Sequence, residues 1–191
     1  MHLDNVSCET RERLDKFVAS LLKWNKIHNL IAEGTEPDVI QRHIIDSYQL
    51  INLLPHEPTT ILDFGTGAGF PGFVIACDGL HHMVLCEKSA KRTAFLRYVS
   101  RETGVACEVF DKKLEEDTRT YDVIVSRAVS SLTRLWELCE TRLNPGGYAL
   151  FMKGKSYRDE LQKFNSNGVV TFELIPSITD KESVIIKLIK R

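Results

Sequence analysis

The chain has 191 residues, of which 43% are hydrophobic and 27% are charged, and this composition is typical of a single globular domain. Its 25 Lys and Arg residues and 26 Asp and Glu residues give a net charge of −1, which excludes a uniformly basic nucleic-acid-binding surface. No segment approaches the roughly 20 apolar residues of a membrane helix, and the N-terminus lacks the pattern of a signal peptide. We therefore expect a cytoplasmic protein without a membrane partner. The spacing of histidines and cysteines predicts no metal ligand.

Residues 1–57 have helical patterns. Apolar residues recur at helical spacing in a first segment: Leu14, Phe17, Val18, Leu21 and Leu22. A second set has the same periodicity: Ile40, Ile44, Tyr48 and Ile51. Thr35, with Asp38 three residues later and Pro37 in the first turn, predicts the start of the second helix. We expect residues 1–57 to form a helical extension packed on a core of residues 58–191, within one compact domain.

After Pro58 the pattern changes to alternating strands and helices. Short apolar runs predict buried parallel strands: Thr60–Phe64, Met83–Glu87, Ala106–Phe110, Tyr121–Val125 and Tyr148–Met152. Helical patterns lie between and after them: Gly72–Gly79, Ser89–Thr103, Ser131–Leu143 and Ser156–Phe164. The segment Asn144–Gly147 predicts a turn. This alternation predicts a parallel sheet with helices on both faces.

The C-terminal part of the chain predicts two more strands, Val169–Ile175 and Ser183–Ile189, spaced as in an antiparallel hairpin. The fold class is therefore α/β and Rossmann-like, with a mostly parallel seven-stranded sheet, an antiparallel edge hairpin and a small N-terminal helical region. No apolar stripe is left without a place in the core, so we expect a monomer.

The most informative segment is Ile61–Gly72, in which a strand runs into a glycine-rich turn and then a helix. In the first strand–helix unit of an open sheet, this turn lies at the crevice where ligands bind. Glycine lets the backbone adopt positive φ and approach a ligand closely. Gly65, Gly67 and Gly69 are therefore candidate cofactor-binding residues. Glu87, at the end of the next strand, can accept hydrogen bonds from both hydroxyls of a ribose.

Two ligand classes fit this segment. Gly67 to Gly72 matches the dinucleotide pattern GxGxxG, with Glu87 twenty residues after Gly67. Asp63 to Gly69 matches the DxGxGxG loop of S-adenosylmethionine-dependent methyltransferases. Pro71 removes a backbone N–H that a pyrophosphate would use at the helix N-terminus. An acidic strand end also suits a cationic sulfonium. The residues therefore favour a methyltransferase, with a nicotinamide-dependent oxidoreductase as the alternative.

Several motifs in chain order resemble the RsmG (GidB) family of bacterial methyltransferases of 16S rRNA. The resemblance covers about residues 24–155. It is carried by Trp24-Asn25-Lys26 with Asn29-Leu30, Arg42-His43-Ile44-Ile45-Asp46-Ser47, the glycine loop Gly65–Gly72, Lys91-Arg92, Ser126-Arg127-Ala128, Pro145-Gly146-Gly147 and Lys153-Gly154. The resemblance implies a class I S-adenosylmethionine-dependent methyltransferase fold. It also implies methyl transfer to N7 of a guanine in the 530 loop of 16S rRNA, at position 527 in the usual rRNA numbering. The implied partner is the small ribosomal subunit or its assembly intermediate.

The resemblance also implies site residues. Those that would hold S-adenosylmethionine are Gly65, Phe70, Glu87, Leu114, Glu115 and Arg127. Those that would meet RNA are Arg42, His43, Lys91, Arg92 and Lys153. This chain departs from the family pattern in four ways. Lys113-Leu114-Glu115 stands where the family usually has Arg-x-Glu, and Ile31 follows Asn29-Leu30 where the family has Thr. The acidic ribose position is Glu where the family more often has Asp, and the N-terminal helical region is short. None of these departures lies in the glycine loop.

The implied chemistry agrees with the residues present. Guanine N7 carries an in-plane lone pair and no proton, so its attack on a sulfonium methyl needs no general base. The sequence has no evident catalytic dyad, and Arg127 is the one residue predicted to orient the reactants. Residues 88–113 carry seven basic and three acidic side chains, a net of +4, whereas residues 1–60 have a net of −3. This segregation predicts a basic RNA face, and Phe70 and Tyr157 are the candidates for stacking on the target base. A third hypothesis, motivated by the absent base, is a non-catalytic cofactor-binding or ribosome-assembly protein.

Overall fold

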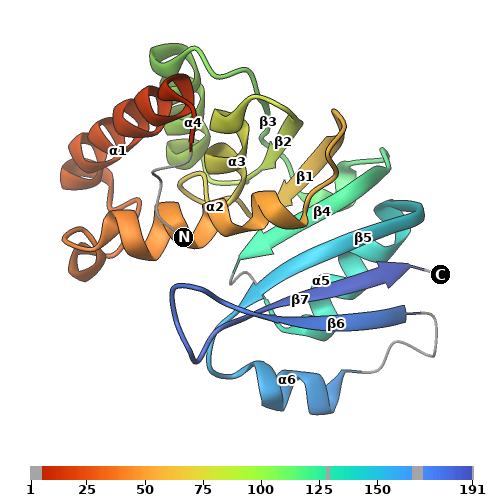
Figure 1. Cartoon of the computed structure of the whole chain (residues 1–191). Helices are drawn as coiled ribbons and strands as arrows, with labels where there is room; N and C mark the ends of the chain where they lie inside the picture. Colours follow the sequence, from red (N-terminus) through yellow and green to blue (C-terminus); the bar gives the residue numbers. More distant parts are fainter. Residues whose placement is uncertain (1–5, 128–129, 165–169, 191) are drawn as a thin grey trace.

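The computed structural model describes residues 6–127, 130–164 and 170–190. Within these residues, seven strands form one sheet in the order β3-β2-β1-β4-β5-β7-β6 (Figure 1). Strands β1 to β5 are parallel, and β7 pairs antiparallel with both β5 and β6. The strands are β1 Thr60–Phe64, β2 His82–Cys86, β3 Glu108–Phe110, β4 Tyr121–Arg127, β5 Leu143–Lys153, β6 Val170–Pro176 and β7 Val184–Lys190.

This sheet confirms the predicted seven-stranded, mostly parallel arrangement with an antiparallel edge hairpin. Two details of the predictions, Val169 at the start of the hairpin and Ala128 in a family motif, lie outside the described residues.

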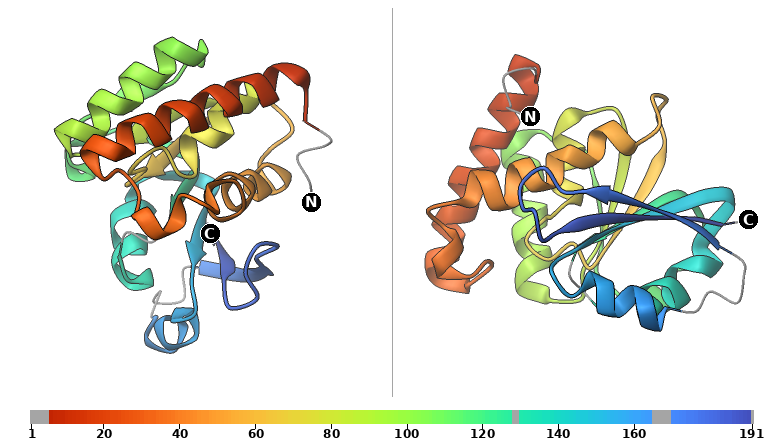
Figure 2. Two further views of the ribbon diagram at one scale, coloured as in Figure 1. Left: turned by 90° about the vertical axis from the view of Figure 1, so that its left-hand side faces the viewer. Right: turned by 60° about the horizontal axis from the view of Figure 1, so that its bottom comes forward.

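Successive residues of the central strands face opposite sides of the sheet, so each strand contributes to two hydrophobic clusters. On β2, Met83 and Leu85 join one cluster, whereas Val84 and Cys86 join the other. Because both faces are covered by helices, these strands read as continuous apolar runs rather than as alternating patterns. Figure 2 shows the helices on both sides of the sheet from two further directions.

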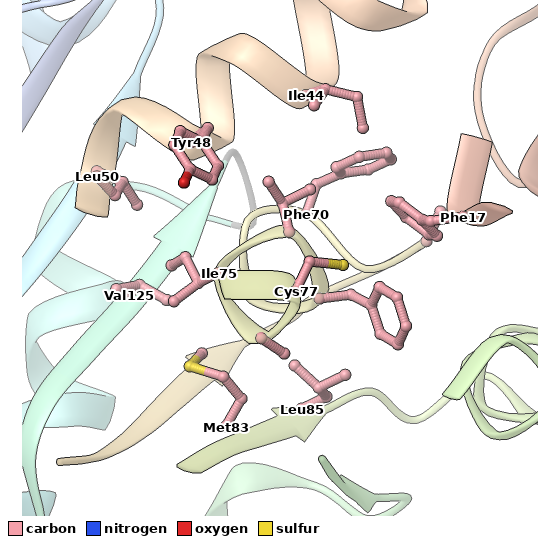
Figure 3. Close-up of a cluster of buried hydrophobic side chains, with 14 of the residues drawn as sticks. Phe17, Ile44, Tyr48, Leu50, Phe70, Ile75, Cys77, Met83, Leu85 and Val125 are labelled. Atoms are coloured by element: carbon pink, nitrogen blue, oxygen red, sulfur yellow. The ribbon is translucent and has the colours of Figure 1, made fainter. Parts of the chain in front are cut away.

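The first face is covered by α1 (Cys8–His28), the helical segment that includes α2 (Asp46–Tyr48), α3 (Gly72–Asp78) and α4 (Ala90–Thr103). Helix α1 begins at Ser7, whose side-chain oxygen accepts a hydrogen bond from the Thr10 N–H at 3.0 Å. Leu14, Phe17 and Leu21 of its apolar stripe are buried, and the Phe17 ring contacts three aromatic rings of the core, one of them that of Phe70 (Figure 3). The opposite face is covered by α5 (Leu132–Cys139) and α6 (Tyr157–Lys163).

The second predicted helix differs from the expectation. Thr35 ends a short 3-10 helix (Glu33–Thr35), and its hydroxyl donates to the Ala32 carbonyl at 2.7 Å instead of capping a helix. The longer helical segment starts later, with a π-helical stretch (Ile40–Ile45), α2 and a closing 3-10 helix (Gln49–Leu53). The capping prediction was wrong because Thr35 uses its own side chain to close the preceding turn. A π-helical stretch inside a helix often marks a functional position.

The predicted turn at Asn144–Gly147 lies inside β5, where it forms a bulge. Leu143 pairs with Tyr121, and the next pairing in the ladder joins Tyr148 to Val123. Four residues of β5 are therefore opposite a single residue of β4. At Gly147 a Cβ atom would lie 2.9 Å from the Asn144 and Asp122 carbonyl oxygens, so only glycine fits this crossing.

Candidate functional site

A cavity of about 780 Å³ opens at the carboxyl ends of β1, β2 and β4. This is the edge of an open α/β sheet where ligands bind. The cavity brings together many of the residues predicted to bind a cofactor or RNA: His43, Gly65, Gly67, Phe70, Glu87, Arg92, Leu114, Glu115 and Arg127. It also includes Leu30, Ile31 and Ala32 from the loop after α1, which the sequence alone did not predict as site residues.

The glycine loop is held in place by its neighbouring strand. The N–H groups of Gly65 and Thr66 both donate to the Cys86 carbonyl at the end of β2, at 3.0 and 3.1 Å. Gly65 and Gly67 have φ angles of 73° and 60° and line the cavity. Both therefore combine a left-handed backbone conformation with a position on the cavity wall.

Gly69 and Gly72 do not line this cavity. At Gly69 a Cβ atom would lie 2.8 Å from the Cβ of Phe73, and at Gly72 it would lie 2.6 Å from Asp63. These two glycines let the loop and α3 pack closely against the sheet. Gly69 was predicted to bind the cofactor, whereas the structure gives it a packing role.

The start of α3 is occupied by a carboxylate of the protein. Asp63 is fully buried at the end of β1, and its Oδ2 accepts the Gly72 N–H at 2.7 Å. Burial raises the pKa of Asp63 to about 7, although the Thr66 side chain and the Gly72 N–H oppose this shift. The Gly72 N–H at the first turn of α3 is therefore already used by a carboxyl group of the protein, whereas a pyrophosphate needs the free N–H groups of a helix N-terminus. The geometry therefore disfavours the dinucleotide reading of the glycine loop.

Glu87 lies just after β2 and is 7% exposed. Its Oε1 accepts the Ser89 N–H at 2.8 Å, and its Oε2 lies 3.5 Å from Nη1 of Arg92. The contact with Arg92 is long, so Oε2 keeps capacity to accept a hydrogen bond from a ligand hydroxyl. Arg92, which was predicted to meet RNA, is therefore beside the carboxylate on the wall of the same cavity.

Arg127, at the end of β4, is held by residues of the N-terminal helical region. Its Nη2 contacts Nδ1 of His43 at 3.0 Å, and its Nη1 lies 3.4 Å from Oδ2 of Asp46. Nη1 also donates to the Arg42 carbonyl at 3.3 Å, and the guanidinium lies over the Phe70 ring, 4.9 Å from its centre. These contacts fix one orientation of a cation at the wall of the cavity.

The contacts of His43 determine its protonation. A guanidinium has no lone pair and can only donate, so Nδ1 of His43 accepts from Arg127 and the proton lies on Nε2. Nε2 then donates to Oγ1 of Thr35 at 3.1 Å. Burial, together with the charges of Arg127 and Arg42, lowers the pKa of His43 to about 4. His43 is therefore neutral near pH 7 and connects the loop after α1 to Arg127.

The model of a known family, described as "rRNA small subunit methyltransferase G", matches residues 10–182 of this chain. A ribosomal RNA small subunit methyltransferase G from Rhodospirillum centenum is 39% identical over 184 residues, which cover 96% of this chain and 85% of that protein. One from Cereibacter sphaeroides is 37% identical over 190 residues, covering 96% and 92%. The chain belongs to the rRNA small subunit methyltransferase G family.

Solved structures with lower sequence identity share the fold. A TehB-like S-adenosylmethionine-dependent methyltransferase from Corynebacterium glutamicum has a TM-score of 0.61 at 17% identity, covering 91% of this chain and 98% of that chain. The ribosomal protein L11 methylase from Lactobacillus delbrueckii has a TM-score of 0.64 at 14% identity, covering 76% of each chain. The predicted class I methyltransferase fold is confirmed.

Two motifs of the methyltransferase G family that are distant in sequence meet in the structure. The segment Arg42–Ser47 supplies the Arg42 carbonyl, the His43 ring and the Asp46 carboxylate, and all three contact Arg127 of the Ser126-Arg127 pair. Among the described residues, Asp46 pairs with Arg127 and not with Arg42, although the i, i+4 spacing of Arg42 and Asp46 favours an ion pair.

Other residues predicted to meet RNA lie outside the cavity. Lys91 donates from Nζ to the His28 carbonyl at 2.8 Å, which ties α4 to the end of α1. Lys153 is buried, pairs with Glu160 at 2.8 Å and also donates to the Ser130 carbonyl. These contacts give Lys91 and Lys153 partners within the protein itself. Three exposed lysines, Lys88, Lys112 and Lys113, line the cavity instead.

Sequence reasoning also missed the loop between β6 and β7. Thr179 donates from its hydroxyl to Oδ1 of Asp46 at 2.6 Å, and the Ile178 N–H donates to Oε1 of Gln49 at 3.0 Å. This loop follows the helical region by about 130 positions, and no local pattern in it indicates such a contact. In the described parts of the chain, no helix has the length and apolar character to cross a membrane. The same residues contain no group of His, Cys, Asp and Glu that would hold a metal ion.

Proposed function

We propose that this chain transfers a methyl group from S-adenosylmethionine to N7 of a guanine in the 530 loop of 16S rRNA. Membership in the methyltransferase G family supports an rRNA substrate. The observation that carries the proposal is the cavity at the carboxyl ends of β1, β2 and β4, which contains the glycine loop, Glu87 and Arg127 together. We further propose that the protein acts as a monomer in the cytoplasm on the small subunit or its assembly intermediate.

The residues present fit S-adenosylmethionine. The cavity volume of about 780 Å³ lies within the range of about 300–1,000 Å³ for small-molecule sites. Glu87 would accept the ribose hydroxyls, and Leu114 with Glu115 would flank the adenine. Gly65 and Gly67 would let the chain pass close to the methionine end, with Arg127 at the wall. When bound, the cofactor supplies an electrophilic methyl group carried by a sulfonium.

The reaction needs no proton transfer from N7 before attack, because N7 carries a free lone pair. The work of the protein is therefore to position the two reactants and to exclude water, which is worth about 7–11 kcal/mol in well-oriented reactions. Neutral His43 agrees with this view, since a residue with a pKa near 4 that donates from Nε2 to Thr35 is not available as a base. Its role is to hold Arg127 in place.

Exposed lysines at the cavity mouth supply the proposed RNA contact. Within the part of the chain that the structure describes, Lys88, Lys112 and Lys113 have no ion-pair partner, whereas Arg97 in the same basic segment pairs with Asp111 at 2.8 Å. Phosphate contacts of this kind fix orientation and make affinity depend on salt. Phe70 is 3% exposed and is enclosed by Phe17, His43 and Arg127, so it is not available to stack on an RNA base.

The decisive experiment is transfer of a labelled methyl group to small ribosomal subunits from a strain that lacks the modification, followed by nuclease digestion and mass spectrometry. We expect N7-methylguanosine in the 530 loop. Methylation at another nucleotide would reject the proposed specificity, and cofactor binding without transfer to subunits or to their assembly intermediates would favour the non-catalytic hypothesis.

The cofactor assignment is tested separately with Gly67→Asp. The left-handed φ of Gly67 strains any side chain placed there, but no atom lies nearer than 3.9 Å to an added Cβ, so Gly67→Asp places a carboxylate in the cavity without a clash. We expect loss of S-adenosylhomocysteine binding by calorimetry. Gly104→Asp is the matched control, because Gly104 has φ of 70° with open space around it at the end of α4. Full binding by Gly67→Asp would contradict the loop assignment.

A further inference from the structure

A second cavity of about 310 Å³ shares Arg127 with the first. It lies at the carboxyl ends of β4 and β5 and at the start of β7, where Met152 and Lys153 pair with Ile185 and Val184. We propose that this cavity receives the target guanine and that Asp180 recognises its Watson–Crick edge. This inference rests on the proposed methyl transfer to guanine and assigns the acceptor side of that site.

The lining of the second cavity matches a flat heteroaromatic base. Its volume is at the lower end of the range for small-molecule sites. Buried apolar side chains of Met152, Val184 and Ile185 form one part of the wall, and hydroxyl and carboxylate groups of the loop before β7 form another. A base extruded from RNA has apolar faces and a polar edge, and enzymes that modify bases read this edge by hydrogen bonds.

The position of the cavity fits an acceptor. A methyl acceptor has to come within about 3–3.5 Å of the methyl carbon, so its site must adjoin the cofactor site. Arg127 is the residue common to both cavities, and it is held in one orientation by His43 and Asp46. A base in the second cavity would therefore adjoin the cofactor cavity at Arg127, the residue that lines both.

The charge of the loop favours guanine over the other bases. Guanine presents two neighbouring donors on its Watson–Crick edge, the N1–H and the exocyclic N2 amine, and a carboxylate accepts both. Adenine presents a lone pair at N1, which a carboxylate repels. The Glu182 N–H and the Ser183 hydroxyl donate to the two oxygens of Asp180 at 2.9 and 2.7 Å. These contacts lower the pKa of Asp180 and leave further lone pairs on an exposed carboxylate.

The other carboxylate of the cavity, Asp46, is already saturated. Its Oδ1 accepts from the Thr179 hydroxyl at 2.6 Å and from Nε2 of Gln49 at 2.9 Å, and its Oδ2 faces Arg127. Asp46 therefore holds the loop before β7 against the helical region. This bracing fixes the position of Asp180 before a ligand arrives, as a specific base-reading site requires.

A cation at the same cavity completes the site. Arg42 is exposed, lines the cavity, and its charge contributes to the lowered pKa of Asp180. An arginine beside a base-binding cavity suits the phosphate of the extruded nucleotide.

The test compares Asp180→Asn with the wild type in methyl transfer to unmethylated small subunits. Replacing one carboxylate oxygen by an amide donor opposes the guanine donors, so we expect kcat/KM for the subunit to fall by about tenfold to a hundredfold. Calorimetric affinity for S-adenosylhomocysteine should remain at the wild-type value. Asp15→Asn is the matched control, because Asp15 is an exposed aspartate on α1 away from both cavities.

The possible results of this experiment test the assignment of Asp180 and the proposed function separately. Wild-type kcat/KM in Asp180→Asn would overturn the assignment of Asp180. An equal loss of S-adenosylhomocysteine affinity would also overturn it, because the second cavity would then hold part of the cofactor. Absence of methyl transfer by the wild-type protein itself would instead reject the proposed function. Thermal unfolding of the variant, compared with the wild type, separates lost recognition from lost folding.

Discussion

Arg127 and His43 show, at the scale of single residues, how a family motif acquires a structural meaning. The sequence predicted Arg127 at the cofactor and His43 at the RNA, each from its place in a motif. The structure joins them, with Nη2 of Arg127 and Nδ1 of His43 3.0 Å apart across 84 positions of sequence. Strand-end positions such as Gly65, Gly67 and Glu87 could be predicted because the ends of parallel strands meet at one edge of the sheet. A contact between two distant side chains has no such local signature.

The neutral state of His43 leads to a pH-dependent stability. Its folded-state pKa of about 4 lies below the ordinary value of about 6.5, so the unfolded chain takes up the proton first as the pH falls. This contribution to stability is complete above about pH 6.5 and is lost as the pH falls toward 4. Replacing His43 by Gln supplies an amide oxygen as acceptor for Arg127 in place of the ring nitrogen and removes the titrating group. We expect the free energy of unfolding of the wild type to fall by about 2 kcal/mol more than that of the variant between pH 7.5 and 4.5.

Urea denaturation of both proteins at the two pH values measures this difference. Subtracting the free energy of unfolding of the variant from that of the wild type cancels the contribution of other titrating groups. One of these is Asp63, whose raised pKa makes the folded state more stable as the pH falls. His82→Gln, at an exposed position on β2, is the control and should follow the wild type. If the free energies of unfolding of the wild type and of His43→Gln differed by the same amount at both pH values, the prediction would be contradicted.

At the scale of elements, short apolar runs in the sequence predicted most of the strands well. The first strand was predicted with its observed bounds, Thr60–Phe64, and the second was displaced by one residue. These strands are buried on both faces, so their apolar runs are strong signals. The helical segment around Ile40–Ile45 was predicted less well, because the π-helical stretch and the 3-10 turn before it depend on contacts of Thr35 and His43 rather than on periodicity.

The loop between β6 and β7 is an element whose position depends on a few hydrogen bonds. Thr179→Val removes the hydroxyl that donates to Asp46 at 2.6 Å while keeping the shape of the side chain. We expect a loss of about 1–2 kcal/mol in the free energy of unfolding, since hydrogen bonds to charged groups are worth about 1.5–3 kcal/mol. Hydrogen exchange at the Ile178 amide should become faster in the variant. Thr171→Val, at an exposed position of β6, serves as the control and should leave that exchange rate unchanged.

At the scale of the whole molecule, aromatic packing joins helix α1 to the glycine loop and to helices α3 and α4. The ring of Phe17 lies 4.8 Å from that of Phe73, 5.4 Å from that of Phe70 and 6.1 Å from that of Phe95, measured between ring centres. The division into residues 1–57 and 58–191 stays a prediction, but these contacts lead us to expect that the two parts unfold together. The apolar periodicity predicted that Phe17 is buried, whereas its partners could not be predicted from periodicity.

Phe17→Ala tests this coupling. Removing a fully buried ring should lower the free energy of unfolding by about 3–5 kcal/mol, and a single denaturation transition should shift as a whole. Ile27→Ala on the same helix is the control, because Ile27 is 75% exposed and its loss should have little effect. Two separate transitions, with the second unaffected by Phe17→Ala, would show that the helical region unfolds independently.

The reversed direction of β7 has a consequence for how the specificity of this protein can change. Because β7 runs against β5, it begins at the edge where β4 and β5 end, and the connection before it lies there as well. The glycine loop and the β6–β7 connection therefore lie at the same edge of the sheet, although they are far apart in the sequence. Substitutions or insertions between Ser177 and Ser183 would remodel the wall of the second cavity without altering the backbone of β1, β2 or the glycine loop. With the acceptor in the second cavity, as we propose, changes in this loop would alter acceptor choice without changing the proposed cofactor site.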